Sequence, residues 1–226
     1  SFMKLRTMLL GLICLGASLA QAEGELMVMP ATLKVYNNHE HTVNVKNLGD
    51  APLYLSISLQ KVMNPGESPE KKQPISALTH PGMLASPDKL TLGPGQSRVI
   101  GLKSLVEPEA ETLYRLYIVP VRSMQVEEAP EDKITAPMSV AIGYGVLVRH
   151  MPPPAKQKTG WTHRCDASGM TLENTGNVSL QLSDLESVAR KQQKFKVALF
   201  PGTPQHFAGK RLNFIVAEKP QVLECP

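Results

Sequence analysis

Apolar and polar residues alternate in short runs along most of the chain, and turn residues separate the runs. Because every second residue of a strand points to the same face, this alternation predicts strands with one buried side. Segments such as Asn47–Pro52 and Pro201–Pro204 supply the turns. The predicted strands are 33–36, 42–46, 53–59, 90–92, 98–102, 113–119, 137–149, 169–173, 178–182, 196–200 and 212–216. No run predicts a long amphipathic helix, although 185–192 is compatible with a short one.

A proline-rich segment divides this pattern into two parts. Three prolines, 152–154, are followed by polar residues up to Gly160, which is the composition of a hinge between domains. The spacing of strands and turns on both sides is typical of immunoglobulin-like sandwiches, with about seven strands in the first. The sequence therefore predicts an all-β fold with two immunoglobulin-like β-sandwich domains, 23–152 and 153–226.

Residues 1–22 are expected to lie outside the folded protein. Two residues precede Met3 and are interpreted as a cloning remnant, and two basic residues then lead into the apolar run 8–17. That run is about half as long as the ~20 residues of a membrane-spanning helix. Ala20-Gln21-Ala22 has the small-x-small pattern of a cleavage site. We interpret the segment as a secretory signal, with no membrane insertion of the chain that begins at Glu23.

Charge and cysteine content fit a secreted protein. The formal charge is +4, and it falls to +2 once the two basic residues of the signal are removed, so no nucleic-acid partner is indicated. The secreted chain keeps Cys165 and Cys225 in a compartment where thiols can be oxidised, which predicts one disulfide. A free thiol or a metal pair is the alternative, but neither cysteine has a CxxC partner or a nearby histidine.

Candidate chemistry is sparse. His39 and His41 would share one face of a strand, but the pair Asn37-Asn38 before them indicates a turn. No metal site is therefore predicted, and an extracytoplasmic metal-handling module remains an alternative function. The chain has no nucleophile elbow, no HExxH motif, no P-loop and no paired-carboxylate motif. We therefore expect a binding protein rather than an enzyme, without a cofactor.

The strand 137–149 is the most informative segment. It carries no charge between Met138 and Val148, whereas soluble proteins usually protect sheet edges with charge or proline. An ordinary central strand is one interpretation, and an edge open to a partner strand is the other. Arg115 is a second unusual feature, because it lies within the apolar strand 113–119. If Tyr114 and Leu116 face the core, Arg115 faces the opposite side, either solvated or in a cleft where its guanidinium can hold a carboxylate.

Several motifs in order resemble the periplasmic pilus-assembly chaperones of the PapD-like superfamily, in particular the alternate chaperone–usher class that serves class 5 fimbriae. These motifs cover nearly all of the secreted chain and are 60–66, 90–98, 111–120, 144–152 and 172–177. The resemblance implies two domains in a boomerang arrangement, with a subunit bound along the edge strand and in the cleft between the domains.

The resemblance also implies how a subunit would be held. An incomplete pilin sandwich would receive the chaperone's edge strand, with backbone hydrogen bonds for affinity and alternate side chains as plugs. The expected plugs are Met138, Val140, Ile142 and Tyr144.

Two further sets of residues are predicted from the resemblance. Better-known relatives hold the subunit's terminal carboxylate with an arginine and a lysine, which are replaced here by Thr32 or Leu33 and by Gly145 or a neighbour. Arg115, followed by Lys34, is the expected substitute anchor. An acid–arginine–acid bridge between the domains is expected from Glu111, Arg149 and Glu218.

The function predicted from the sequence is that of a periplasmic chaperone that binds, folds and caps fimbrial pilin subunits and delivers them to an outer-membrane usher. Self-association of the free protein, hiding its edge strand, is a further expectation. The alternative is a fimbrial or adhesive structural protein with immunoglobulin-like domains.

Overall fold

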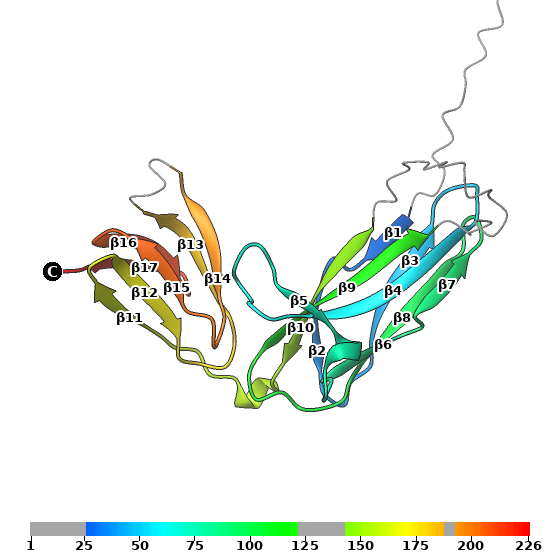
Figure 1. Ribbon diagram of the computed structural model, residues 1–226, viewed down its shortest axis with the longest axis horizontal. Coiled ribbons are helices and arrows are strands. Elements are labelled where there is room, and N and C mark those ends of the chain that lie inside the picture. Colours follow the sequence, from blue (N-terminus) through cyan, green and yellow to red (C-terminus); the bar gives the residue numbers. More distant parts are fainter. Residues whose placement is uncertain (1–25, 122–142, 188–192) are drawn as a thin grey trace, which may run out of the picture.

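The computed structural model describes residues 26–121, 143–187 and 193–226, which form two β-rich arms joined at an angle (Figure 1). The first arm contains β1 (Leu26–Met29), β2 (Thr32–Tyr36), β3 (His41–Asn47), β4 (Leu53–Val62), β5 (Lys72–Pro74), β6 (Met83–Ser86), β7 (Lys89–Leu92), β8 (Ser97–Ser104), β9 (Thr112–Val121) and β10 (Tyr144–Met151). The second arm contains β11 (Trp161–Asp166), β12 (Gly169–Asn174), β13 (Leu180–Glu186), β14 (Phe195–Leu199), β15 (Gln205–Ala208), β16 (Arg211–Val216) and β17 (Lys219–Glu224). Two short 3-10 helices, η1 (Ile75–Ala77) and η3 (Pro154–Lys156), complete the described elements. The predicted all-β fold with two sandwiches is confirmed.

The first domain consists of two sheets packed face to face. One has the strand order β1-β3-β8-β6, and the other has the order β2-β10-β9-β4-β5, with β7 beside β4. Alternate side chains fill the space between them, so that Leu116 and Ile118 of β9 are both 0% exposed. Tyr114 also faces this core, whereas Arg115 and Tyr117 lie on the outer face of the same strand. The facing of this strand was predicted correctly from its alternation.

The start of the described chain changes sheets between its first two strands. β1 pairs antiparallel with β3 in the first sheet, whereas β2 pairs parallel with β10 in the second. Pro30 lies between them, where its lack of an N–H removes one ladder hydrogen bond at the crossing. The crossing brings β2 beside β10 only from Thr32 onward, opposite Leu147.

The second domain is a smaller sandwich. Its sheets have the orders β11-β12-β15 and β14-β13-β16-β17. Apolar residues between the sheets form its core, including Leu172, Leu182 and Phe214, and Trp161 packs edge-on against Phe214. The predicted disulfide is confirmed: Cys165 of β11 is bonded to Cys225, which follows β17, so the bond links one sheet to the other.

One type of corner occurs in both domains. In the first, the buried amide of Asn47 donates to the carbonyl oxygens of Ala51 and Leu92, and its oxygen accepts from the N–H of Gly49. In the second, Asn174 makes the equivalent bonds within its own turn and to Leu199. A buried amide with these partners satisfies backbone groups that a turn would otherwise leave unpaired.

A small apolar cluster joins the two arms. Val62 and Leu113 of the first domain pack with Phe200 of the second, with Leu147 and Ala198 at the margin. The loop between β4 and β5 reaches the second domain in Figure 1, and Gly66 in this loop has a left-handed φ of +86°. A Cβ at Gly66 would lie 2.4 Å from the carbonyl oxygen of Ala198, so the close approach requires glycine.

The end of β13 differs from the sequence prediction. Leu185 and Glu186 belong to β13, so the short helix considered for 185–192 does not begin there, and residues 188–192 lie outside the described part. Within the described ranges, no helix is long and apolar enough to cross a bilayer.

Candidate functional site

The end of β10 nearest Tyr144 has a main-chain edge without a strand partner in the described part of the chain. On one side, Tyr144 to His150 pair with β9; on the other, pairing with β2 begins only at Leu147. The N–H of Leu147 donates to the carbonyl oxygen of Ala31 at 3.0 Å, which fixes the direction of its backbone groups. Because backbone direction repeats every second residue, the N–H and C=O of Gly145 also point away from β9, where no described strand pairs with them.

This arrangement corrects the expected extent of the edge. The resemblance implied an open edge from 138 to 148, but Leu147 and Val148 lie between β9 and β2 and are not open. Alternation could not reveal this, because it predicts which face is buried and not which strand lies alongside. Met138, Val140 and Ile142, the expected plugs, lie outside the described residues.

Tyr144, the fourth expected plug, is described and has a partner within the chain. Its hydroxyl donates to the carbonyl oxygen of Leu26 at 2.8 Å, which ties the start of β10 to β1 in the opposite sheet. The side chain is 41% exposed. Tyr144 therefore links the two sheets at the start of β10, next to the outward-facing backbone of Gly145.

Arg115, the expected carboxylate anchor, already holds a carboxylate of this chain. Its Nε lies 3.1 Å from both carboxylate oxygens of Glu70, and its Nη2 lies 2.7 Å from one of them. Hydrogen bonds from Arg115 lower the pKa of Glu70, and the same bonds raise the pKa of Arg115. Both groups therefore stay charged at neutral pH.

The third nitrogen of the Arg115 guanidinium, Nη1, contacts the open edge of β10. Nη1 of Arg115 donates to the carbonyl oxygen of Gly145 at 3.1 Å. A Cβ at Gly145 would lie 3.2 Å from the ring of Tyr117 and 3.9 Å from Cδ of Arg115, so the missing side chain leaves room for these neighbours. Lys72 lies beside the group, 4.0 Å from Glu70 and 5.1 Å from the centre of the Tyr117 ring.

Lys34, the second expected anchor, is differently placed. It lies in β2 directly opposite Arg149 of β10, and it is exposed. Among the described residues, its side chain has no hydrogen-bonding or ion-pair partner. Its ammonium is thus available to an external anion on the face of the sheet that also carries Arg115.

Two of the three residues expected to form the bridge between the domains, Glu111 and Arg149, are bonded to each other. Arg149 binds Glu111 through Nε and Nη2, each at 3.1 Å from a carboxylate oxygen, and Glu111 is 3% exposed. Ser179 of the second domain takes the third place, donating to Glu111 from its N–H at 3.0 Å and from its hydroxyl at 3.1 Å. Glu218 lies instead in the exposed turn between β16 and β17, so its expected role is corrected.

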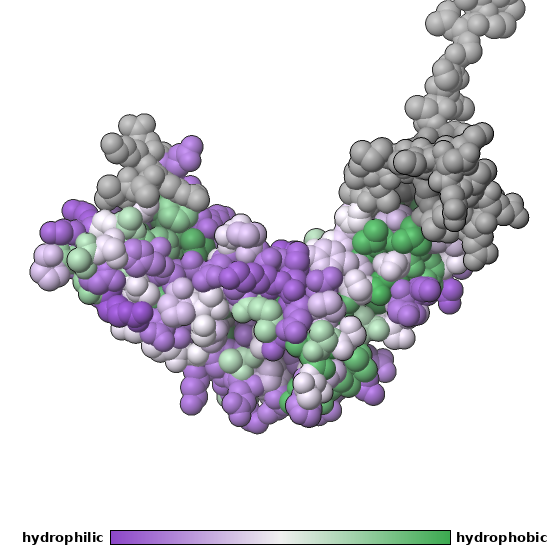
Figure 2. Space-filling view, viewed as in Figure 1, coloured by the Kyte–Doolittle hydropathy of each residue, from purple (hydrophilic) through white to green (hydrophobic). Residues whose placement is uncertain are grey.

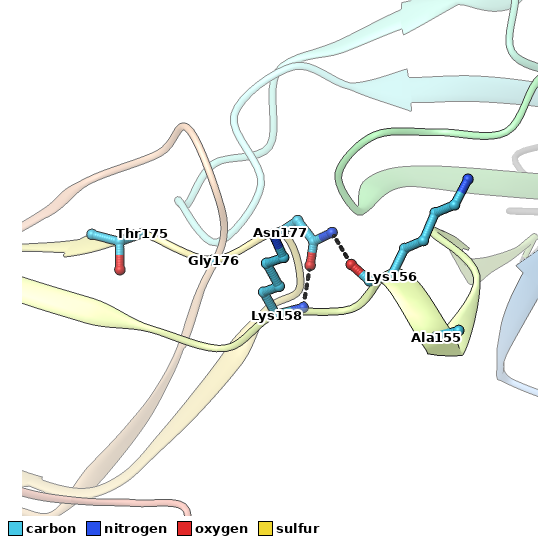
Figure 3. Close-up of a pocket in the computed structure, with 6 residues that line it drawn as sticks. All are labelled: Ala155, Lys156, Lys158, Thr175, Gly176 and Asn177. Carbon is cyan, nitrogen blue, oxygen red and sulfur yellow. Dashed lines mark hydrogen bonds between the residues drawn. The ribbon is translucent and has the colours of Figure 1, made fainter.

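The hinge segment next to this bridge is held by hydrogen bonds between Asn177 and main-chain groups. Asn177 donates from its side chain to the carbonyl oxygen of Lys156 at 2.8 Å and accepts from the N–H of Lys158 at 2.6 Å, as Figure 3 shows. Its own carbonyl accepts from the N–H of Glu111 at 2.8 Å. The residues labelled in Figure 3 line a pocket, and Asn177 bonds to two of them, Lys156 and Lys158, so we assign this pocket to the domain junction.

Each of the two histidines considered for a metal uses one ring nitrogen in a hydrogen bond with the main chain. Nε2 of His41 accepts from the N–H of Tyr36 at 3.0 Å, and Nδ1 of His39 lies 2.9 Å from the carbonyl oxygen of Asn37. Burial and the neighbouring His39 lower the pKa of His41. No cluster of three or more potential metal ligands occurs in the part of the chain that the structure describes.

A buried histidine at the far end of β10 was missed from the sequence. His150 is 1% exposed, and its Nε2 lies 2.7 Å from the hydroxyl oxygen of Ser104. Burial lowers its pKa to about 4, with Lys61 acting in the same direction. The sequence gives no sign of this pair, because Ser104 is 46 residues away and only the strand arrangement brings the two together. It is a structural group rather than part of the open edge.

The surface around the site is mixed. In the view of Figure 2, polar side chains dominate the middle of the molecule, and apolar side chains gather on the first domain. Tyr54 and Val121, paired across β4 and β9, are 39% and 46% exposed. The outer face of the second sheet therefore offers apolar area at the far end of β9, six residues along the strand from Arg115.

Two curated proteins of Escherichia coli are similar to this chain in sequence, and both are named as fimbrial subunits. The one from CFA/I fimbriae is 27% identical over 165 residues, covering 73% of this chain and 68% of that protein. The one from CS1 fimbriae is 23% identical over 164 residues, covering 72% of this chain and 68% of that protein. No protein-family model matches the chain.

Solved structures show the fold. The class 5 fimbriae chaperone CfaA is similar with a TM-score of 0.66 and 22% identity, covering 89% of this chain and 100% of that one. A chain in the chaperone–tip adhesion complex CsuC–CsuE of Acinetobacter baumannii has a TM-score of 0.57 and 15% identity, covering 88% of this chain and 97% of that one. The fold of this chain is thus that of the fimbrial chaperones, and the resemblance to the class 5 chaperones that its motifs indicated is confirmed at the level of the fold.

Proposed function

We propose that this protein is a periplasmic chaperone that lends the edge of β10 to a fimbrial pilin and delivers the pilin to an outer-membrane usher. The observation that carries the proposal is the backbone of Gly145, whose N–H and C=O point away from β9 before β2 joins the sheet. An extended segment of a partner can add a strand at such an edge and satisfy both groups. No catalysis and no cofactor is required, because strand exchange supplies the free energy.

The residues upstream of this edge complete the proposal. Met138, Val140 and Ile142 continue the strand in sequence with Tyr144 and would place alternate apolar side chains in the groove of an incomplete sandwich. Backbone pairing would provide affinity, and the fit of these plugs would provide selectivity among pilins. The secretory signal expected in residues 1–22 would bring the chain to the periplasm, where pilin and usher meet.

The anchor for a pilin's terminal carboxylate is better assigned to Lys34 than to Arg115. Glu70 and the carbonyl oxygen of Gly145 already occupy Arg115, so an external carboxylate would first have to displace Glu70. Lys34 is exposed and has no such competitor among the described residues. We therefore reverse the order of the two candidates proposed from the sequence.

A single pair of variants tests the strand-lending function. Val140→Asp would place a charge in the apolar groove of the pilin, so it should abolish protection of a co-expressed pilin while the chaperone stays folded. Val99→Asp is the matched control, because Val99 lies in a strand of the other sheet and is 54% exposed. The yield of soluble pilin in the periplasm is the measurement. Soluble pilin with Val140→Asp at the level of the control would contradict the assignment of the strand.

A building block of the fibre itself is the second candidate, and the names of the two curated relatives favour it. Such a protein would polymerise with its own kind as its concentration rises, because it must both offer and accept a strand. A chaperone would form a stable one-to-one complex with a different protein. Sedimentation of the purified protein, alone and with a co-expressed pilin, separates the two functions.

A further inference from the structure

Three residues from different parts of the first domain converge on the open edge. Glu70 comes from the loop before β5, Arg115 from the middle of β9, and Gly145 from the start of β10. Arg115 joins them, with Nε and Nη2 on the carboxylate of Glu70 and Nη1 on the carbonyl oxygen of Gly145. That carbonyl points away from β9, where no described strand pairs with it.

We propose that Glu70 and Arg115 form an edge guard, a contact that occupies the outward-facing carbonyl of Gly145 and weakens the pairing of β10 with a second copy of this chain, which is the self-association expected from the sequence. Open sheet edges are sites of unwanted strand pairing, and charged side chains placed on them are a common protection. The inference rests on the proposed function only in taking this edge as the docking edge.

Gly145 allows the guard to operate. The guanidinium of Arg115 starts opposite Leu147 and must pass over β10 at position 145 to reach the outer carbonyl. A Cβ at this position would press against the ring of Tyr117 at 3.2 Å and would contact Cδ of Arg115 at 3.9 Å. The absence of a side chain at position 145 therefore leaves room for the guanidinium to cross the strand.

The loop that carries Glu70 holds the carboxylate in place. The side chain of Asn64 bonds across the base of the loop, accepting from the N–H of Lys71 at 2.6 Å and donating to the carbonyl oxygen of Pro69 at 3.0 Å. The N–H of Met63 also donates to the carbonyl oxygen of Lys71 at 2.7 Å. Glu70 thus lies between two anchored neighbours, which reduces the conformational entropy lost when it holds Arg115.

The test measures self-association of the purified protein without any pilin. Glu70→Gln keeps the shape of the side chain but removes the charge that holds Arg115. Glu107→Gln is the matched control, because it makes the same change of charge in the exposed Lys156–Glu107 pair at the hinge. Sedimentation equilibrium gives the dimer dissociation constant of each protein, and amide hydrogen exchange shows whether Gly145 becomes protected in the dimer.

We expect Glu70→Gln to dimerise about tenfold more tightly than the wild type and the control, which is the effect of about one charge-assisted hydrogen bond. The N–H of Gly145 should become protected in that dimer. An unchanged dissociation constant would overturn the inference, as would tighter association that leaves exchange at Gly145 as it was.

A second measurement needs no variant. The Nε–H of Arg115 should exchange slowly in the wild type, because it lies between the two oxygens of Glu70, and fast exchange of this proton would also overturn the guard. If Glu70→Gln dimerises more tightly but the protein protects no pilin, the edge guard is supported and the proposed function is contradicted. The two failures are therefore distinguishable.

Discussion

Acid should destabilise the first domain through His150, the buried histidine at the end of β10. In the folded protein its pKa is about 4, whereas the value for an exposed histidine is 6.5. The unfolded chain therefore binds the proton more readily over this interval. The stability that the neutral ring of His150 contributes should be fully present above pH 6.5 and should be lost as the pH falls towards 4.

The size of the loss follows from the two pKa values. They differ by about 2.5 pH units, and each unit corresponds to about 1.4 kcal/mol, so His150 should cost about 3 kcal/mol by pH 4. The physical cause is burial, since His150 is 1% exposed and packs beside Tyr114 and Ser104. Protonation would place a positive charge in this buried site, where the neighbouring groups stabilise only the neutral ring.

Urea unfolding followed by NMR measures this effect in the first domain alone. The amide of Leu116 in β9 reports on that domain, whereas the single tryptophan, Trp161, belongs to the second. In the wild type, the free energy of unfolding should be lower at pH 4.5 than at pH 7, and most of the about 3 kcal/mol estimated above should contribute to this drop. In His150→Gln, the drop should be smaller by that amount. His163→Gln, which removes an exposed histidine of the second domain, should behave as the wild type does.

One direct observation can refute the reasoning without a variant. The ring protons of His150 should titrate near pH 4 in the folded protein. A midpoint near 6.5 would mean that the ring is not buried as described, and an equal pH dependence in the wild type and His150→Gln would lead to the same conclusion.

Two further predictions concern the junction of the domains. Arg149→Met should lower the free energy of unfolding by about 3 kcal/mol, because Glu111 would remain buried without its cation; urea titration measures it, and adding Glu111→Gln should restore part of the loss. If the double variant is as unstable as Arg149→Met, the buried charge is not the cause. Gly66→Ala should loosen the contact with the second domain and raise the radius of gyration in small-angle X-ray scattering, because its Cβ would lie 2.4 Å from a carbonyl oxygen of that domain. Gly95→Ala, also at a left-handed φ but with nothing within 4 Å, carries the same backbone strain without the clash, and equal effects of both changes would contradict the account.

Alternation in the sequence was sufficient to predict the two sandwiches and the facing of individual strands. In β9 it separated Tyr114 and Leu116 in the core from Arg115 on the outer face, because strand geometry is local and repeats every second residue. The disulfide could also be predicted, since the expected secreted chain has only Cys165 and Cys225 to pair.

Contacts between distant segments could not be predicted in this way. Glu70 meets Arg115 across 45 residues, and nothing in the local pattern of either segment indicates the other. The length of the open edge depends on where β2 joins β10, which is a matter of strand order and register. Ser179 in place of Glu218 has a similar cause, because the partner at the junction depends on how the two domains meet.

The most direct test of the central claim is amide exchange at Gly145 in this protein alone and after its co-expression with a fimbrial pilin. The account predicts that the N–H of Gly145 exchanges rapidly in the free protein and becomes strongly protected in the complex, because a strand of the pilin pairs with it. Equal exchange at Gly145 in the free and bound states would contradict the claim that this edge receives the pilin.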